Sequence, residues 1–377
     1  MRLVCWVTSL LLVAPIVAAG QSLGETSGPW VMERSGSTAG LRGIHAVGGG
    51  VAWASGTNGT VLRTEDGGYE WQSCAMPPGA EKLDFRGIWA WDDNTAIVMA
   101  SGPGDASRLY KTTDGCSSWK LVFTNPDKDG FCDAIVFGAP GAGAHSPQAG
   151  GVLIGDPVNG VFAIFDSGDK GSTWTRFNSD DPKHQPKARP GESLFAAGNQ
   201  AAITPGDDSG FAFVTGGADS RIYEEEIHEP FDAAFWVSLG SERLRFASGS
   251  SAGAFAIGER LWSDPMYCDF MIVGGDYRKP DSPAASAFVS GKFRWPTGSR
   301  RIEWSAKPPH GYRSAVAWDS GAKAWIAAGT NGSDISYDDG NTWVSLDNGN
   351  WNALSLPWVV GPNGRVGKLD PDKLKRK

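Results

Sequence analysis

The apolar residues of this 377-residue chain fall into short runs instead of long helical stripes. Typical runs are GVAWAS at 50–55, TAIVMAS at 95–101, GFAFVTG at 210–216 and AWIAAG at 324–329. Turn-forming Gly, Asn, Asp and Pro residues surround these runs, and the chain holds 51 Gly. The pattern predicts an all-β fold of many short strands joined by tight turns.

One polar motif recurs between the runs, and we call its four copies the acidic turns. They read TEDGGYEW at 64–71, TTDGCSSW at 112–119, SGDKGSTW at 167–174 and SYDDGNTW at 336–343. Successive aspartates are 48, 55 and 169 residues apart, and the last spacing equals about three units of 56 residues. Repeats of about 50 residues with several strands each are typical of β-propeller blades.

The chain divides into seven such units, which predicts a seven-bladed β-propeller over residues 28–370. We place the first strand of each unit near Arg42, Arg86, Asp133, Glu192, Gly253, Arg313 and Asn352. The last unit has only three strands, and the segment PWVMERS at 29–35 has no partners of its own. As the outer strand of the seventh blade, this segment would close the ring and remove an open sheet edge.

A structural role explains the acidic turns better than a catalytic one, because four copies around a ring cannot form one site. Glycine permits the turn, the aspartate accepts backbone N–H groups, and the tryptophan packs between neighbouring sheets. The expected structural residues are Asp66, Trp71, Asp114, Trp119, Asp169, Trp174, Asp338 and Trp343. Cys116 replaces the second glycine in one copy, and we expect a disulfide with Cys74 in the preceding unit.

The N-terminus has the layout of a signal peptide over residues 1–20, with Arg2, an apolar run and then small residues. Its removal leaves 33 basic and 42 acidic residues, a net charge of about −9. We therefore expect an exported chain, periplasmic or extracellular, with no stable membrane anchor after cleavage and no nucleic-acid partner. Residues 371–377 are read as a frayed, basic C-terminal tail.

The acidic turns match the Asp-box, or BNR, repeat, which sialidases share with unrelated propellers. A second resemblance covers most of the mature chain. PPGAEKLDFRGI at 77–88, LVFTNPDKDGF at 121–131, GGDYRKPD at 274–281 and GPNGRVGKL at 361–369 resemble bacterial members of the photosystem II stability/assembly factor-like family. The same holds for GPGDASRLYKTTDGC at 102–116 and ARPGES at 188–193. This resemblance implies an exported, monomeric propeller that binds a protein or peptide, without cofactor or catalytic activity.

Strand starts and the following glycine turns lie on one face of a propeller, around the mouth of its central channel. This geometry predicts a charged site that the loop at 178–192 would cover, bringing Lys187. Its members are Arg42, Arg86, Asp133, Asp156, Arg189, Glu192, Asp276, Tyr277, Arg278 and Arg313. Two interpretations remain open: the arginines bind carboxylates of a ligand, or they pair internally with the acids.

The main alternative function is a sialidase-like glycoside hydrolase. Arg42, Arg86 and Arg313 would imitate the arginine triad of sialidases, and Tyr277 with Glu192 would imitate their nucleophile pair. The Phe-Arg-Ile-Pro segment of that family is missing, since residues 85–88 read FRGI. A purely structural scaffold is a third possibility. The five histidines lack ligand spacing, so no metal site is expected.

Overall fold

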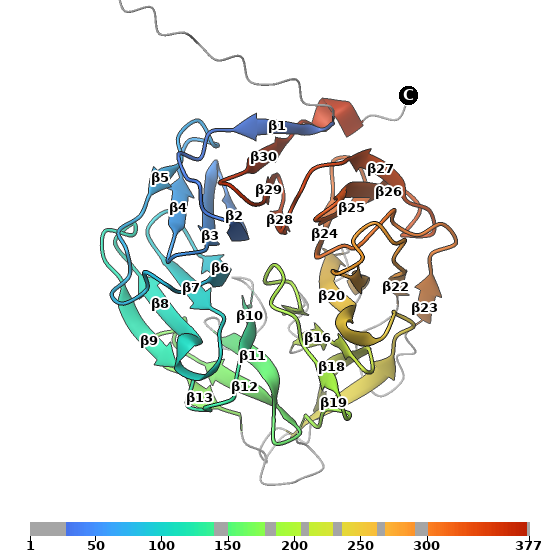
Figure 1. Cartoon of the computed structure of the whole chain (residues 1–377), viewed down its shortest axis with the longest axis horizontal. Helices are drawn as coiled ribbons and strands as arrows, with labels where there is room; N and C mark the ends of the chain where they lie inside the picture. The colour runs from blue at the N-terminus through green and yellow to red at the C-terminus, as the bar shows by residue number, and fades with distance from the viewer. Residues whose placement is uncertain are drawn as a thin grey trace, which may run out of the picture.

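In a computed structural model the chain forms a ring of seven antiparallel sheets, or blades (Figure 1). The structure describes residues 28–138, 150–177, 186–204, 211–228, 236–261, 268–290 and 301–374, so the expected signal peptide lies outside the described residues. The seven-bladed propeller that the repeat spacing predicted is confirmed.

The first three blades follow the chain in order from the inside of the ring outward. Blade one contains β2 (Leu41–Gly48), β3 (Val51–Gly56), β4 (Val61–Thr64) and β5 (Gln72–Ser73). Blade two contains β6 (Phe85–Ala90), β7 (Ala96–Ala100), β8 (Arg108–Thr112) and β9 (Lys120–Thr124), with the 3-10 helix η1 (Gly104–Ala106). Blade three contains β10 (Cys132–Phe137), β11 (Gly151–Val158), β12 (Val161–Ser167) and β13 (Thr175–Arg176).

The remaining blades are less regular. Blade four contains β15 (Ala202–Ile203), β16 (Ala212–Val214), β18 (Arg221–His228) and β19 (Trp236–Arg243). Blade five contains β20 (Gly249–Leu261), β21 (Cys268–Asp276), β22 (Ser286–Ser290) and β23 (Arg301–Trp304), extended by the short strands β14 (Glu192–Ser193) and β17 (Gly216–Gly217). Blade six contains β24 (Ala315–Asp319), β25 (Ala324–Gly329), β26 (Gly332–Ser336) and β27 (Val344–Asp347). Blade seven contains β28 (Ala353–Ser355), β29 (Trp358–Val360), β30 (Val366–Leu369) and β1 (Trp30–Glu33).

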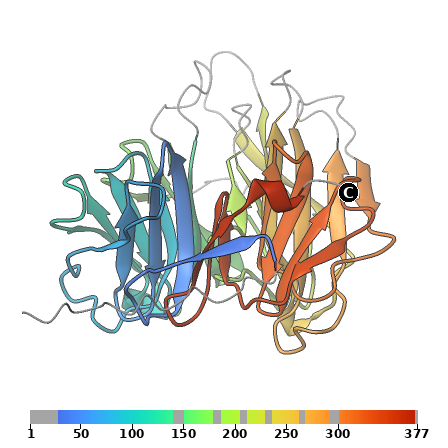
Figure 2. The same cartoon turned by 90° about the horizontal axis from the view of Figure 1, so that it is seen from above.

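The predicted ring closure is confirmed, because β1 pairs antiparallel with β30 as the outer strand of blade seven (Figures 1 and 2). Side chains at both ends of β1 also bind the neighbouring blades. Trp30 Nε1 donates to Ser333 Oγ of blade six at 3.0 Å. Glu33 accepts the indole N–H groups of Trp71 from blade one at 2.9 Å and of Trp358 from blade seven at 3.1 Å. The closing strand is therefore fixed to three blades.

Replacing Glu33 with alanine is expected to reduce the free energy of unfolding by about 2 kcal/mol, because two largely buried indole N–H groups lose their acceptor. Glu33→Gln keeps an acceptor oxygen and should lose less than half as much. Urea unfolding followed by tryptophan fluorescence measures both variants. Equal losses in the two variants would show that Glu33 contributes packing instead of hydrogen bonds.

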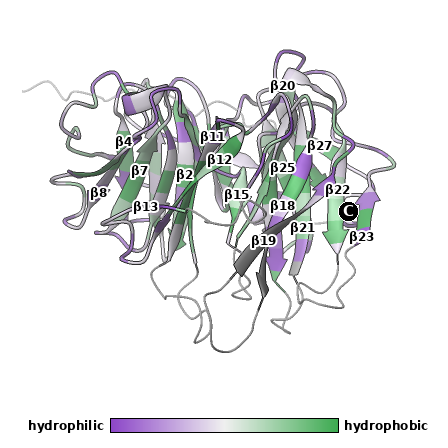
Figure 3. Ribbon diagram, turned by 90° about the horizontal axis from the view of Figure 1, so that it is seen from below, coloured by the Kyte–Doolittle hydropathy of each residue, from purple (hydrophilic) through white to green (hydrophobic). Residues whose placement is uncertain are grey.

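The hydrophobic core lies between neighbouring blades, not at the centre of the ring. Between blades one and two, for example, Trp53, Phe85, Tyr110 and Trp119 pack in one buried cluster. In Figure 3 the hydrophobic colour follows strands such as β7 and β25. Each blade is thus buried on both faces by its neighbours, as short and mostly apolar strands require.

The acidic turns have one shared geometry, illustrated by the copy in blade two. Thr112 Oγ1 donates to Asp114 Oδ1 at 2.8 Å, and Asp114 in turn accepts the backbone N–H and the hydroxyl of Ser118. These hydrogen bonds from Ser118 and Thr112 lower the pKa of Asp114 to about 2. Because the carboxylate is used within its own turn, the turn has a structural role.

The tryptophans of the acidic turns connect each blade to the one before it. Trp119 Nε1 donates to Ala75 O of blade one at 3.0 Å, and Trp343 Nε1 donates to Ser286 Oγ of blade five at 2.8 Å. Trp71 reaches Glu33 of blade seven in the same way. Trp174 is only half-buried: its Nε1 donates within its own turn to Gly171 O at 3.2 Å, and its ring lies 6.5 Å from that of Phe123 in blade two. These contacts agree with the fastening role that the sequence predicted.

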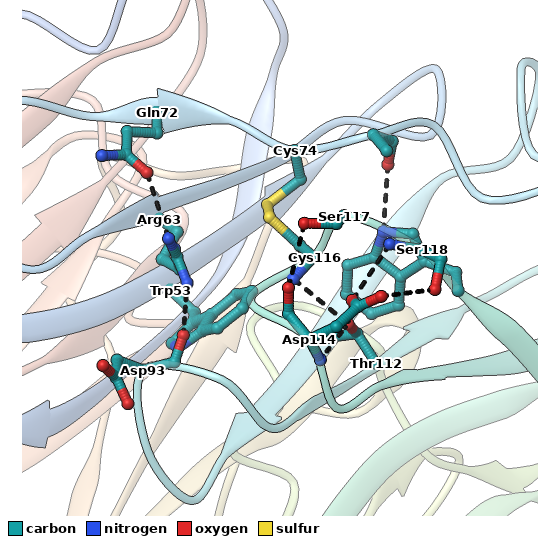
Figure 4. Close-up of a disulfide and its surroundings, with 12 residues drawn as sticks. Trp53, Arg63, Gln72, Cys74, Asp93, Thr112, Asp114, Cys116, Ser117 and Ser118 are labelled. Carbon is teal, nitrogen blue, oxygen red and sulfur yellow. Dashed lines mark hydrogen bonds between the residues drawn. A yellow bond between two sulfur atoms is a disulfide. The ribbon is translucent and has the colours of Figure 1, made fainter.

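Cys74 and Cys116, the expected pair, are joined by a disulfide with a Cα–Cα distance of 5.3 Å (Figure 4). The bond links the outer edge of blade one to the acidic turn of blade two. Cys116 has φ of +64°, the conformation that Gly68, Gly171 and Gly340 adopt in the other copies. A residue with a side chain therefore occupies a position that favours glycine, because the disulfide requires a sulfur there.

Two predictions about the chain's path were wrong. Glu192 does not start the first strand of blade four, because β14 pairs with β17 and the innermost strand of that blade is β15. Residues 371–374 do not fray but form the 3-10 helix η2 (Pro371–Leu374). Leu374 is buried, and its carbonyl accepts the Tyr337 hydroxyl at 2.6 Å. The propeller therefore includes the start of the predicted tail.

Candidate functional site

The central channel is filled by residues 195–200, which we call the plug. The Asn199 side chain accepts the N–H of Ile135 at 2.9 Å and donates to its carbonyl at 3.0 Å. Gln200 Oε1 accepts the N–H of Val316 at 2.9 Å, while Gln200 Nε2 donates to Leu354 O at 3.3 Å. Its backbone carbonyl accepts the N–H of Ile257 at 2.8 Å. The plug thus contacts the innermost strands of blades three, five, six and seven, and Figure 1 shows this yellow-green segment reaching the centre of the ring.

The plug fits because the residues that follow Phe195 are small or carry amides. A Cβ atom on Gly198 would lie 2.7 Å from the carbonyl oxygen of Asn352, closer than a side chain permits. The side-chain amides of Asn199 and Gln200 donate to and accept from backbone groups of the innermost strands, as the backbone of a neighbouring strand would. The channel mouth at which the sequence placed the charged site is therefore closed by the plug.

Arg42 and Arg86 remain at this surface and share one carboxylate. Arg42 Nε lies 3.1 Å from Asp84 Oδ1, and Arg86 Nε lies 2.9 Å from Asp84 Oδ2. The two arginine side chains keep 35% and 31% of their exposure. Because two guanidinium groups face one carboxylate, this corner keeps N–H donors for a further acceptor.

An aromatic ledge lies on the other side of the plug, built from Phe195, Phe255, Tyr277 and Tyr312. Phe195 of the plug stacks on Phe255 with ring centroids 4.0 Å apart, and Tyr277 meets both rings edge-on. Tyr312 packs against Phe255 from below. Tyr277 is 43% exposed, and the Arg278 guanidinium lies 5.9 Å from its ring. The ledge is therefore a rigid, partly exposed aromatic surface beside arginine.

Two further residues of the predicted site are Asp276, which lies next to Tyr277 of the ledge, and Arg189, which precedes the plug in the sequence. Asp276 accepts the N–H of Arg278 at 3.0 Å and lies 3.9 Å from the Lys279 ammonium. A hydrogen bond from Ser251 and these neighbours lower the pKa of Asp276, so it stays ionised. Arg189 is exposed, and its backbone N–H donates to Glu192. Of the covering loop, residues 178–185 lie outside the described residues.

Asp133, Asp156 and Glu192 do not rim the mouth, which corrects the sequence prediction. Asp133 is 1% exposed beneath the plug, and Asp156 Oδ1 accepts the N–H of Leu194 at 2.9 Å. Glu192 is also buried and accepts the Tyr223 hydroxyl at 2.9 Å, as well as the hydroxyl of Thr215. The sequence prediction placed these residues by the start of each strand. It could not show that Glu192 bonds to Tyr223, or that Asp156 bonds to the backbone of Leu194.

Arg313 is not available to a ligand either. It is fully buried and binds Asp334 Oδ2 through Nε at 2.7 Å and through Nη2 at 2.5 Å. Its Nη1 donates to Asn331 Oδ1, and His310 packs beside the pair. For this arginine the structural interpretation holds, and the arginine triad of the sialidase alternative loses one member.

The sialidase alternative also predicted a hydrogen-bonded pair of Tyr277 and Glu192, and the structure pairs Glu192 with a different tyrosine. Glu192 bonds to Tyr223 instead of Tyr277, and both residues of the pair are buried. Burial and the neighbouring Glu192 carboxylate raise the pKa of Tyr223 above its usual range, so the hydroxyl stays protonated. A group buried in this way does not present a nucleophile to substrate.

The parts of the chain that the structure describes contain no cluster of three or more metal-binding side chains. They also contain no helix with the length and hydropathy needed to cross a membrane.

Comparison with known proteins gives the fold alone. No protein-family model and no curated protein matches the sequence. Among solved structures, YCF48 bound to D1 peptide aligns with a TM-score of 0.56 and 16% identity over 93% of this chain and 99% of that chain. YCF48 from Cyanidioschyzon merolae aligns at 0.54 and 17% over 91% and 99%. The WD40 propeller of Doa1 aligns at 0.52 and 10% over 92% and 99%. These likenesses support the seven-bladed architecture.

Proposed function

We propose that this chain is an exported, non-catalytic propeller that binds a protein or peptide partner at its plugged channel mouth, as an assembly factor does. The observation that carries the proposal is the pairing of Arg42 and Arg86 with the aromatic ledge across the plug. Arginine and tyrosine are the residues enriched among binding hot spots. The structural neighbour YCF48, solved with a D1 peptide, supports a peptide as the class of ligand.

The site is preorganised for an extended segment that carries a carboxylate and an apolar side chain. The carboxylate would bind the free N–H donors of Arg42 and Arg86, where charge-assisted hydrogen bonds are strongest. The apolar side chain would pack on Tyr277, whose ring is already held by Phe195 and Phe255. Because neither part needs to move, little binding energy is lost in ordering the site.

Peptide selection tests this proposal. Peptides are selected on the wild-type protein from a random-sequence display library, and the affinity of the best binder is measured by calorimetry. The double variant Arg42→Gln with Arg86→Gln should weaken binding about 10- to 100-fold, the value of one or two charge-assisted hydrogen bonds. Tyr277→Ala should also weaken it. Replacing the acidic residues of the peptide with their amides should reproduce the effect of the arginine variants.

Arg243→Gln provides the matched control, because Arg243 is exposed and lies on the outer strand β19, away from the plug. It should bind like the wild type, and thermal unfolding should show that all variants remain folded. Failure to select any peptide, or binding that tolerates the arginine and tyrosine changes, would contradict the proposal. Hydrolysis of sialosides by the wild-type protein would instead favour the enzyme alternative.

A further inference from the structure

Two carboxylates lie beside the start of the plug, near one arginine: Asp133 is buried and Asp156 is partly exposed. Asp133 lies on β10, where burial raises the pKa of its carboxyl and the backbone N–H groups of Asp156 and of Ala196 in the plug lower it only in part. Asp156 on β11 accepts the N–H of Leu194 at the start of the plug. Arg86 donates to Ala196 O at 3.5 Å from the other side. Residues 194–196, at the start of the plug, therefore lie against two acids and one arginine.

One oxygen of this group has no hydrogen-bond donor. Within the described part of the chain, no donor reaches Asp133 Oδ2, although the residue is only 1% exposed. A buried ionised carboxylate without a full set of donors is costly, and a second carboxylate nearby increases the cost. A single proton on the pair reduces that cost, because it neutralises one of the two negative charges.

The surrounding charges do not offset two ionised carboxylates. Arg86 is the cation that faces Asp133 from β6, and it already pairs with Asp84. The Cys132 thiol on β10 has its pKa raised to about 12 by burial and by Asp133, so it stays neutral. Glu192, on β14 just before the plug, already accepts a hydrogen bond from the Tyr223 hydroxyl. Asp156 is partly exposed, whereas Asp133 is buried, so movement of the plug would let water reach Asp133.

We propose that Asp133 and Asp156 form a pH-sensitive lock, which holds the plug in the channel when the pair carries a proton and loosens it when both carboxylates are ionised. The direction follows from the electrostatics. Burial raises the pKa of Asp133, with a further contribution from Asp156, and burial also raises the pKa of Asp156. Groups with a raised folded pKa stabilise the closed state fully below their unfolded pKa, and that stability is lost as the pH rises through the folded pKa.

Hydrogen exchange of the plug tests the lock without any partner. Mass spectrometry follows the peptide that covers residues 194–201 from pH 5 to pH 8, with the intrinsic pH dependence of exchange removed. Protection in the wild type should fall at least about tenfold over this range, the effect of one unit of pKa shift. Asp133→Asn, which cannot ionise, should keep its protection at pH 8. If that variant does not fold, Asp156→Asn provides the same test.

Asp105→Asn is the matched control, because this acid lies in η1 and its side chain is 81% exposed. It should show the full pH dependence of the wild type. Protection that does not change with pH, or that falls equally in Asp133→Asn and the wild type, would overturn the proposal. Since Arg86 also belongs to the proposed partner site, a lock would make partner binding pH-dependent. That consequence rests on the proposed function, whereas the exchange experiment does not.

Discussion

Replacing Arg313 with leucine is expected to lower the free energy of unfolding by about 3–5 kcal/mol, because it leaves the carboxylate of Asp334 buried without its cation. Urea unfolding measures the loss. Proteins of this size commonly unfold through intermediates, so the midpoint and the slope of each transition should be compared. Arg301→Leu is the control: Arg301 forms an exposed pair with Glu303, and its loss should cost less than about 1 kcal/mol.

A double variant separates the ion pair's own contribution from the cost of breaking it. Arg313→Leu combined with Asp334→Leu removes both charges, and it should recover much of the stability that the single change loses. If the double variant is no more stable than Arg313→Leu, the loss comes from packing around His310 and Asn331 and not from the unpaired carboxylate. A single variant as stable as the wild type would contradict the burial of this pair.

Removing the disulfide is the second large effect. Cys74 and Cys116 are 42 residues apart in sequence, and loop-closure entropy for this separation predicts a loss of about 4 kcal/mol in the variant Cys74→Ala with Cys116→Ala. Unfolding of this variant, compared with the wild type under oxidising conditions, measures it. Reduced wild-type protein should match the variant approximately, because neither has the cross-link.

The position of Cys116 allows a sharper version of the experiment. Its φ of +64° is easy for glycine and costs about 1–2 kcal/mol for residues with a Cβ. The pair Cys74→Ala with Cys116→Gly should therefore be about 1 kcal/mol more stable than the alanine pair. Equal stability of the two pairs would mean that the turn changes conformation once the sulfur is gone.

The regular part of the fold could be predicted from sequence because its signals are local. Asp114, Gly68 and Trp343 act within one turn or between adjacent blades, so their spacing reports blade number directly. The segment that contains Trp30 and Glu33 had the pattern of a strand without a partner. Because only the seventh unit lacked an outer strand, the segment could be assigned to it. For six of the seven units the predicted first strand overlaps the innermost strand that the structure shows.

The plug could not be predicted because its stabilising contacts are long-range. The segment that includes Leu194 and Phe195 reads like the first strand of any other unit. What distinguishes it is the bonding of Asn199 to Ile135 and of Gln200 to Val316, over 64 and 116 residues. The two amides and the preceding small residues were the available signal, since a strand rarely contains the run Ala-Ala-Gly-Asn.

The candidate site shows the same limit. Arg42, Arg86 and Arg313 occupy equivalent positions in their units, but their partners do not. Asp84 precedes β6 and serves two arginines, whereas Asp334 lies on the next strand but one from Arg313. A rule based on blade position therefore finds the arginines, and only the three-dimensional structure tells which of them keep exposed donors.

The pairing of β1 with β30 also determines the order of events during synthesis. β1 is made at the start of the propeller, but its only ladder partner in the described chain is made more than 330 residues later. The first six blades can begin to pack while the ribosome is still translating, whereas the ring cannot close until the end of the chain emerges. Until then β1 remains an unpaired strand, which can pair with strands of other chains. A chaperone bound to β1 would prevent such pairing.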